Sequence, residues 1–391
     1  MIDMSTNKYV CIHGHFYQPP RENAWLEVVE LQDSAAPFHD WNARINFECY
    51  APNTSARILN HEGKIQKIIN NYTRINFNFG PTLLSWMESE DNETYNAIIA
   101  ADKKSMEKNG GHGNAIAQVH SHLIMPLANE KDKHTQVIWG LKDFEYRFGR
   151  KAEGIWLAET AANTDTLEVL ATHGIKYTIL APRQMKSFKK MGDGGWTDAR
   201  KGFDVRRPYQ ISLPSGKSIA VFFYDGVISQ EVAFDKLLDN GKRFAERFIS
   251  TFDKDEEPQL VHIATDGESY GHHHKHGEMA LADCLNYIEE NGLAVITNYS
   301  EYLEKFPPEH EVVIHENSSW SCVHGIERWR SHCGCNSGGN NGWNQKWRHY
   351  LRQGLNRLRD ELASIYDKHS SLIYKDKWAA RNEYIDLILD N

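Results

Sequence analysis

Two acidic residues each close an apolar stretch that we predict to be a buried strand. Glu159 ends Gly-Ile-Trp-Leu-Ala-Glu, and Asp266 ends His-Ile-Ala-Thr-Asp. A carboxylate in such a place loses hydration unless it is paired or used in chemistry. A nucleophile and a proton donor about 5–5.5 Å apart could together cleave a glycosidic bond with retention. The alternative for either carboxylate is a helix N-cap or a salt bridge.

Further polar side chains follow other predicted strands. His13 and His15 end the first apolar stretch, His120 and His122 follow the third, and Glu268 lies two residues after Asp266. In a β/α barrel the carboxyl ends of all strands meet on one face, where active sites are built. We therefore expect these side chains to converge at one mouth. The alternative for each histidine is a purely structural role.

Short apolar runs bounded by Gly, Pro or polar residues supply the strands of this arrangement, because buried parallel strands have that pattern. The predicted strands are Tyr9–His13, Arg74–Phe79, Ala115–Val119, Gly154–Ala158, Tyr177–Ala181, Ile219–Phe223, Leu260–Ala264 and a possible eighth at Ala294–Thr297. Helical spacing of apolar residues predicts intervening helices at Thr54–Asn71, His134–Phe148 and Val232–Thr251. Repeated β–α units predict a parallel sheet, as a barrel or a doubly wound sheet. No GxGxxG follows the first strand, which disfavours a dinucleotide-binding sheet.

The pattern changes after about residue 300. Ser318–Trp343 is rich in Gly, Ser, Asn, Cys and Trp and is predicted to be a long loop. A strong helix is predicted from near Trp343, and a second at Lys377–Leu389. We expect a catalytic barrel over residues 1–300 and a loop with a helical cap over 301–391. The last helix has no clear stop signal, which fits either a terminal helix or a fragment of a longer protein.

The amino-acid composition indicates which classes of binding partner the protein is expected to have. The chain of 391 residues has 44 basic and 53 acidic residues and a net charge of −9. This balance argues against nucleic acid or an anionic membrane surface, because both require clustered cations, and it is compatible with a neutral sugar. The six cysteines form no CxxC pair, and neither a signal segment nor an apolar run of about 18 residues is apparent. We predict a cytoplasmic protein, with its oligomeric state left open.

The order of motifs resembles family 57 of the glycoside hydrolases. Its first motif, His-x-His-Gln-Pro, is similar to His13-Gly-His15-Phe-Tyr-Gln18-Pro, which has two more residues before Gln18. Its second motif is loosely similar to the segment from Gly113 through His122 to Pro126.

The third and fourth motifs carry the catalytic pair of that family. The third resembles Trp156-Leu-Ala-Glu159, and the fourth resembles Asp266-Gly-Glu268-Ser-Tyr-Gly-His272. The four motifs span residues 9–276. In addition, the Cys- and Trp-rich stretch from Glu327 to Trp343 resembles an uncharacterised subgroup of the family.

The resemblance implies an incomplete (β/α)7 barrel followed by a C-terminal helical region. It also implies a retaining double displacement on α-linked glucans, as an α-amylase, 4-α-glucanotransferase or branching enzyme, with no cofactor. Protonated Asp266 would donate to the glycosidic oxygen, and ionised Glu159 would attack the anomeric carbon. We expect Glu159 and Glu268 to raise the pKa of Asp266. The predicted substrate contacts are His13, His15, Gln18, His122, Trp156, Glu268, His272 and Trp343.

Three clusters suggest metal as an alternative. His13 and His15 with Asp266 could form the metal set of a polysaccharide deacetylase-like hydrolase, and the run from His272 to His276 could bind zinc. Cys322, His332, Cys333 and Cys335 form the third cluster. Because ligands two residues apart fit a tetrahedral site poorly, we predict loop cysteines there and no metal site. A non-catalytic glycan-binding protein is the other alternative.

Overall fold

Seven parallel strands follow one another in chain order through the centre of the molecule. The structure is a computed structural model that describes residues 7–254, 257–335 and 342–390. The seven strands are β1 (Lys8–Phe16), β4 (Asn76–Phe79), β5 (Ala117–Gln118), β6 (Gly154–Trp156), β7 (Tyr177–Leu180), β11 (Ser218–Phe223) and β12 (Gln259–Asp266). Strand β1 pairs with both β12 and β4, and β5, β6, β7 and β11 pair in that order. The predicted α/β class is confirmed.

Local bridges connect these two sets of strands. Phe77 of β4 forms a parallel bridge with Ala115, two residues before β5. On the other side, the backbone N–H of Asp225, which follows β11, donates to the carbonyl of His262 in β12 at 2.8 Å. The short strand β13 (Val295–Ile296) pairs with the beginning of β1. All eight predicted strands are therefore present, with shifted ends.

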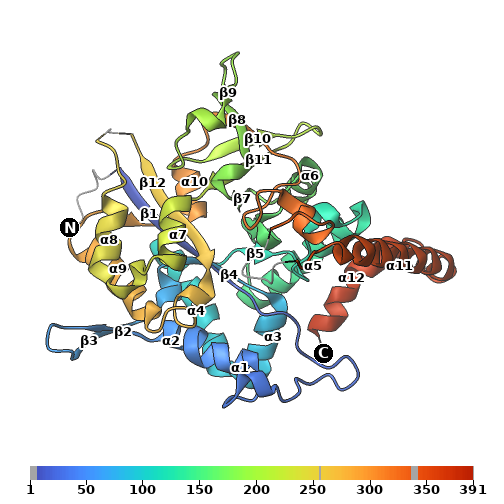
Figure 1. Ribbon diagram of the computed structural model, residues 1–391, viewed down its shortest axis with the longest axis horizontal. Helices are drawn as coiled ribbons and strands as arrows, with labels where there is room; N and C mark the ends of the chain where they lie inside the picture. Colours follow the sequence, from blue (N-terminus) through green and yellow to red (C-terminus); the bar gives the residue numbers. More distant parts are fainter. Residues whose placement is uncertain (1–6, 255–256, 336–341, 391) are drawn as a thin grey trace.

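Helices surround the parallel strands (Figure 1). They are α1 (Trp41–Ile45), α2 (Ala51–Thr54), α3 (Pro81–Glu90), α4 (Asn92–Lys108), α5 (Glu130–Phe148), α6 (Thr164–Thr172), α7 (Gly226–Phe234), α8 (Gly241–Ile249), α9 (Gly277–Glu290) and α10 (Tyr299–Lys305). Local sequence explains their ends. Asn129 caps α5 by accepting from Asp132 N, and Gly149 ends it in the left-handed conformation. The predicted helix at His134–Phe148 is confirmed.

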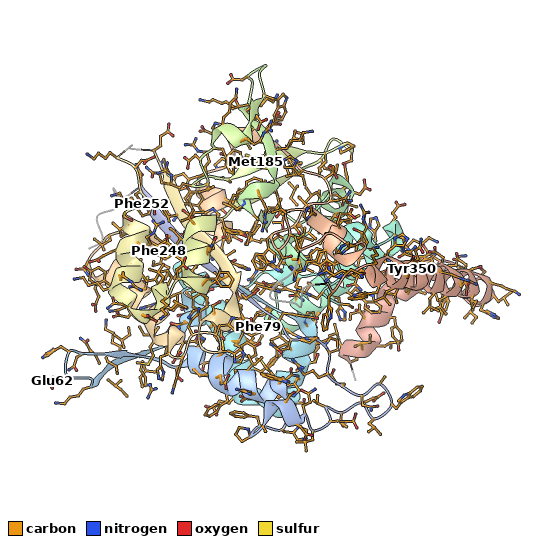
Figure 2. The ribbon with its side chains drawn as sticks, viewed as in Figure 1. Glu62, Phe79, Met185, Phe248, Phe252 and Tyr350 are labelled. Carbon is orange, nitrogen blue, oxygen red and sulfur yellow. The ribbon has the colours of Figure 1, made fainter. Side chains whose placement is uncertain are left out.

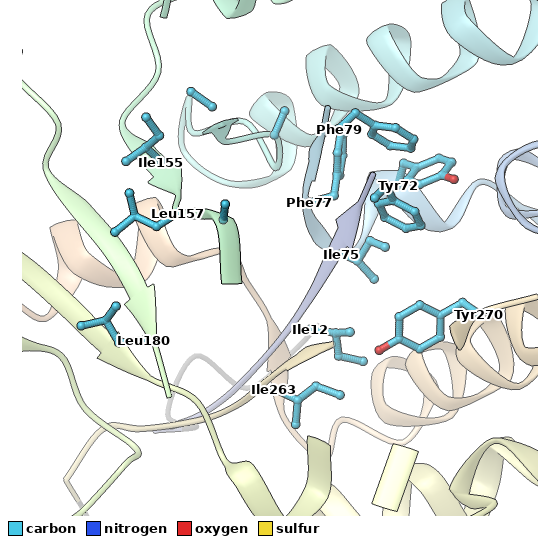
Figure 3. Close-up of a cluster of buried hydrophobic side chains, with 14 of the residues drawn as sticks. Ile12, Tyr72, Ile75, Phe77, Phe79, Ile155, Leu157, Leu180, Ile263 and Tyr270 are labelled. Atoms are coloured by element: carbon cyan, nitrogen blue, oxygen red, sulfur yellow. The ribbon is translucent and has the colours of Figure 1, made fainter. Parts of the chain in front are cut away.

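Apolar side chains from several strands fill the space between strands and helices. Figure 3 shows Ile12 of β1, Ile155 of β6, Leu180 of β7 and Ile263 of β12 within one buried cluster. Each of these four side chains is at most 1% exposed. Burying apolar surface on this scale is the main source of stability for such a sheet. The core therefore gives the strand ends a rigid support.

Antiparallel strands extend the sheet beyond β11, and the sequence analysis did not predict them. They are β8 (Met185–Lys190), β9 (Thr197–Asp198), β10 (Tyr209–Ser212) and β14 (His310–Ile314), which pair in the order β11-β10-β14-β8-β9 apart from one parallel contact between β10 and β14. They lie at the top of Figure 1. Strand β14 brings a segment after residue 300 into the main sheet. The division at residue 300 stays a prediction.

The predicted helix at Thr54–Asn71 is wrong. This segment forms the antiparallel hairpin β2 (Ala56–Leu59) and β3 (Ile65–Ile69). Gly63 in the connection has a φ of +75°, which a glycine adopts without strain and a helix does not contain. The hairpin projects from the molecule, with Glu62 at its tip in Figure 2.

The predicted helix at Val232–Thr251 is broken in the middle. Helix α7 ends at Phe234, and α8 begins at Gly241. Lys236 between them has a left-handed φ of +58°, and Asn240 caps α8 by accepting from Arg243 N. The Asp-Asn-Gly sequence at residues 239–241 is a typical helix start that the apolar spacing concealed.

Two helices form the C-terminal region, as predicted. They are α11 (Trp347–Ser370) and α12 (Lys377–Leu389), and residues 336–341 of the predicted loop lie outside the described residues. Helix α12 packs on α5, while α11 extends outward, with Tyr350 labelled on it in Figure 2. Within the described residues, no helix is long and apolar enough to span a membrane.

Candidate active site

The backbone at Glu159 is in an unusual conformation. Strand β6 ends at Trp156, and a single 3-10 turn, η5 (Ala158–Thr160), follows it. Both Glu159 and Thr160 have a left-handed φ, +57° and +49°. Residues other than glycine rarely adopt this conformation, and it persists where the surroundings hold it in place. The Glu159 side chain on this turn is half-buried.

Two groups hold this turn. The buried Gln184 side chain accepts from Thr160 Oγ1 at 2.7 Å and donates to Thr160 O at 2.8 Å. The loop after β14 also contacts the turn, and Trp320 N donates to Glu159 O at 3.1 Å. The indole N–H of Trp320 also donates to Glu159 Oε2 at 3.0 Å. The candidate nucleophile is therefore fixed in both backbone and side chain.

Asp266 lies at the end of β12 in an open pocket. The pocket has a volume of about 510 Å³, and its lining includes Arg183, Tyr224, Ser229, Asp266, Ser269 and Trp320. Asp266 is exposed to this pocket, yet the walls around it displace much of its hydration. This loss of hydration, followed by the charge of Glu159, raises the pKa of Asp266 to about 6. The rise agrees with the expected effect of Glu159, whereas Glu268, which was also expected to raise the pKa of Asp266, is not among its causes. An acid with this pKa is partly protonated near neutral pH.

Glu268 is buried behind Asp266 and is held by hydrogen bonds. Tyr50 Oη donates to Glu268 Oε1 at 2.5 Å, and Tyr17 N donates to the same oxygen at 3.3 Å. Burial is the main cause that raises the pKa of Glu268 to about 7, and the charge of Asp266 adds to the rise. The repulsion between the Asp266 and Glu268 carboxyl groups therefore raises the pKa of Glu268.

Three of the four histidines predicted to meet at this mouth, His13, His15 and His122, are assembled at the ends of β1 and β5. The fourth, His120, instead lies against α5, where its ring meets Trp139 edge-on at 5.4 Å. His15 Nε2 and His122 Nε2 are 3.1 Å apart and share one hydrogen. His13 contacts the side-chain amides of Asn76 and Asn78, at 2.6 and 3.1 Å. Burial lowers the pKa of both His13 and His122 to about 4, and it lowers that of His15 as well. All three are neutral at pH 7, so each offers one donor and one acceptor.

A series of contacts between aromatic and imidazole rings runs from this histidine cluster to Glu159. The rings of Tyr17 and His122 stack with centroids 3.8 Å apart, and His122 stacks on His15 at 5.1 Å. His15 stacks on Trp156 at 5.0 Å, and Trp156 meets Trp320 edge-on at 5.1 Å. His13 also stacks on Trp156, at 4.8 Å. Residues of the first, second and third motifs therefore form one continuous layer that ends at the Trp320–Glu159 hydrogen bond.

The residues predicted to contact substrate differ widely in their exposure. His13 and Trp156 are completely buried, so they support the histidine layer from behind. Gln18 is 6% exposed, donates to Tyr50 Oη and accepts from Arg21. The remaining two candidates lie elsewhere on the chain: His272 is paired with Glu48, and Trp343 is 76% exposed four residues before α11. Sugar contact by these residues stays a prediction.

The histidine metal sets are not assembled. Both ring nitrogens of His13 face asparagine amides, and His274 Nε2 donates to Ala233 O. Among the residues that the structure describes, one group of His, Cys, Asp and Glu side chains converges closely enough for a metal ion, and it contains none of these histidines.

Comparison with known families decides the assignment. The sequence pattern of "Glycosyl hydrolase family 57" matches residues 7–315, which include both carboxylates and the histidine layer. The chain belongs to glycosyl hydrolase family 57. The resemblance inferred from the motifs is confirmed. Residues 343–391 match a second pattern, "Domain of unknown function (DUF3536)".

Characterised family 57 proteins are distant relatives. A 4-alpha-glucanotransferase of Thermococcus litoralis is 23% identical over 63% of this chain and 36% of its own length. An alpha-amylase of Pyrococcus abyssi is 22% identical over 61% of this chain and 34% of its own. The chain spans about a third of the length of these relatives.

Solved family 57 structures confirm the fold. An exo-type maltose-forming amylase from Pyrococcus sp. ST04 superimposes with a TM-score of 0.71 at 16% identity, covering 98% of this chain and 67% of its own. A branching enzyme from Pyrococcus horikoshii gives a TM-score of 0.57 at 17% identity, over 83% of this chain and 75% of its own. These similarities show a shared architecture.

Sequence reasoning missed the residues that hold Glu159. Gln184 follows a strand end, and Trp320 lies in a loop with no periodic pattern. Their partners are 24 and 161 positions away along the chain. The aromatic composition of the loop was a signal, but it did not indicate which tryptophan would reach the site.

Proposed function

We propose that this protein cleaves or transfers α-linked glucan chains by a retaining double displacement, with Glu159 as nucleophile and Asp266 as acid/base. The observation that carries the proposal is the pair itself: Asp266 has its pKa raised to about 6, partly by the charge of Glu159. A general acid needs a pKa near the working pH, and a neighbouring carboxylate is the nucleophile that the first step of this chemistry requires. Family membership supports the same assignment.

The surrounding residues have separate tasks in this proposal. Protonated Asp266 donates its proton to the glycosidic oxygen while Glu159 attacks the anomeric carbon. Asp266, now ionised, then removes a proton from water or from a sugar hydroxyl, which gives hydrolysis or transfer. Trp320 keeps the Glu159 carboxylate aligned through its 3.0 Å hydrogen bond. The neutral pair His15 and His122 is suited to hydrogen-bond sugar hydroxyls.

The test is product analysis with maltoheptaose and amylose, resolved by chain length. The intact protein is expected to shorten these glucans or redistribute their lengths. Glu159→Ala is expected to lose this activity, and added azide is expected to restore cleavage and give a glycosyl azide of inverted anomeric configuration. Asp266→Ala with azide is expected to give the retained configuration. Azide distinguishes the roles because it enters from the face that the missing carboxylate occupied.

A matched control lies at the other end of the same strand. Glu153 precedes β6 and pairs with His112 and Lys176 away from the mouth, so Glu153→Gln is expected to keep the activity. Turnover that survives Glu159→Ala without azide would remove Glu159 as nucleophile. No turnover of either glucan by the intact protein would contradict the α-glucan substrate.

A further inference from the structure

Three cysteines and one histidine converge in the loop between β14 and α11, outside the carboxylate site. They are Cys322, His324, Cys333 and Cys335, and their ligand atoms all lie within 4.8 Å of one another. None of the three thiols is in a disulfide. Cys322 is buried, Cys333 and Cys335 are half-buried, and His324 is exposed. No role in glucan chemistry involves this cluster.

Four of the six distances between the ligand atoms are close to the edges of a tetrahedron around one ion, and the other two are within 4.8 Å. Cys322 Sγ lies 3.9 Å from Cys333 Sγ and 3.6 Å from Cys335 Sγ. His324 Nδ1 lies 3.8 Å from Cys322 Sγ and 3.4 Å from Cys335 Sγ. A zinc ion with Zn–S bonds of about 2.3 Å and a Zn–N bond of about 2.0 Å has S–S edges of about 3.8 Å and S–N edges of about 3.5 Å. The four atoms are therefore spaced as ligands of one ion.

The types of side chain in the cluster indicate which metal ion it would bind. We propose that Cys322, His324, Cys333 and Cys335 bind one zinc ion. Soft thiolates with one imidazole favour zinc over magnesium or calcium, which take oxygen ligands. Four protein ligands close a tetrahedral site and leave no position for water or substrate, so the ion is structural. The proposal is independent of the proposed glucan activity.

The loop backbone explains how ligands two residues apart can serve one ion. Gly334, between Cys333 and Cys335, has a φ of +79°, a left-handed bend that glycine adopts without strain and that turns both thiols to one side. Gly325 directly follows His324 with a φ of +60°, and a Cβ there would lie 2.0 Å from Asn317 O. Cys333 and Cys335, although two residues apart, can therefore both bind one ion, contrary to the prediction from their spacing. His332, grouped with the cysteines by sequence, accepts from Gln345 N instead, and His324 takes its place.

Neighbouring residues are arranged to support the site. Gln345, just before α11, donates from Nε2 to Cys335 O at 2.7 Å, and its Oε1 accepts from Arg348 Nη1 at 3.0 Å. Such outer contacts fix the orientation of metal ligands, and a nearby arginine offsets the negative charge of three thiolates. The site therefore ties the loop to the start of α11.

The zinc site would also act on the carboxylate site through the chain. Cys322 lies two residues after Trp320, which donates to Glu159 through both backbone and indole. A loop with few buried apolar groups needs another source of order, and a metal crosslink supplies it. The proposed zinc ligand Cys322 and the Trp320 contacts to Glu159 therefore belong to the same short segment.

Metal analysis of the full chain tests the proposal. The protein is produced in zinc-supplemented medium without a metal-binding tag, and its metal content is measured by inductively coupled plasma mass spectrometry. We expect one zinc per chain in the intact protein and in His332→Ala, the control from the same loop. The double variant Cys333→Ser with Cys335→Ser is expected to lose the zinc. Cobalt substitution is expected to give the visible absorption of tetrahedral cobalt thiolate.

Two results would overturn the proposal. One is an intact protein with substoichiometric zinc, or with a disulfide between these cysteines when thiols are counted after denaturation. The other is a double variant that keeps full zinc. If the double variant does not fold, release of zinc from the intact protein by a mercurial thiol reagent decides the question: no zinc released as the thiols react contradicts thiolate ligation. None of these measurements depends on glucan turnover.

Discussion

At the scale of single residues, the two raised carboxyl pKa values determine how activity should depend on pH. Asp266 must be protonated to donate, so the fraction of protein with a competent acid is complete well below its pKa and is lost as pH rises through about 6. We expect kcat/KM for a glucan substrate to fall about tenfold per pH unit above this pKa, because one proton is involved. The measurement is the initial rate at low substrate concentration from about pH 4 to about pH 9. This range includes the usual pKa values of carboxyl groups and of histidine.

Glu268 provides the control for that profile. Its pKa is raised to about 7, so it titrates close to Asp266. Glu268→Gln removes this titration and keeps an oxygen to accept from Tyr50. A basic limb that persists in the variant belongs to Asp266. A limb that disappears in the variant would assign the titration to Glu268 and contradict the role given to Asp266.

At the scale of elements, the turn η5 depends on one buried side chain. Gln184 holds Thr160 through two hydrogen bonds and also accepts from Ala181 N at 2.9 Å and donates to Ser318 Oγ at 3.1 Å. It therefore joins η5, the end of β7 and the loop that carries Trp320. Removing it leaves buried polar groups without partners and frees the left-handed turn to relax.

Gln184→Ala is accordingly expected to lower both stability and kcat. The loss of stability should be about 2–4 kcal/mol, because several buried hydrogen bonds are lost together. The fall in kcat should exceed the change in KM, because Glu159 is displaced while the open pocket is kept. Thr160→Val, which removes one of these bonds, is the control and should have a smaller effect on both. Chemical denaturation and steady-state kinetics measure the two quantities. A stable Gln184→Ala protein with unchanged kcat would contradict the positioning role.

Which elements could be predicted from sequence depended on how strongly they are buried. The parallel strands are buried on both faces and read as short apolar runs, so their positions were predicted. In the hairpin β2–β3 the strand β3 is mostly exposed. Its isoleucines recur at a spacing that is also typical of a helix, so a helix was predicted there. The sheet extension was missed for a related reason: β8 is largely polar and only partly buried.

The candidate site shows the same limit. Glu159, Asp266 and the histidines lie directly after predicted strands, so their convergence followed from the fold class. Gln184 and Trp320 act on Glu159 through loops whose path no local pattern encodes. For the Cys322, Cys333 and Cys335 cluster the sequence predicted loop cysteines without a metal and grouped His332 with them. In the structure His324 rather than His332 joins the cluster, because Gly325 turns the chain.

At the scale of the whole molecule, the C-terminal helices are attached to the sheet through α5. Asn382 of α12 accepts from Thr135 Oγ1 at 2.7 Å with its side chain and from Trp139 Nε1 at 3.1 Å with its carbonyl. Arg381 pairs with Asp132 at 2.8 Å nearby. Helix α11 connects this docked helix to the proposed zinc loop, so the C-terminal region is held at two points.

Weakening the contact between α12 and α5 should leave the proposed zinc loop unchanged. We expect Asn382→Ala to weaken α12 docking by about 1–2 kcal/mol, because the Thr135 hydroxyl loses its side-chain partner at a half-buried contact. Hydrogen–deuterium exchange should then become faster in α12 and on the facing side of α5, while the segment around Trp320 stays protected by its own contacts. Glu383→Ala, at an exposed position of the same helix, should leave exchange unchanged. Faster exchange around Trp320 in Asn382→Ala would show instead that the C-terminal helices and the candidate active site open as one cooperative unit.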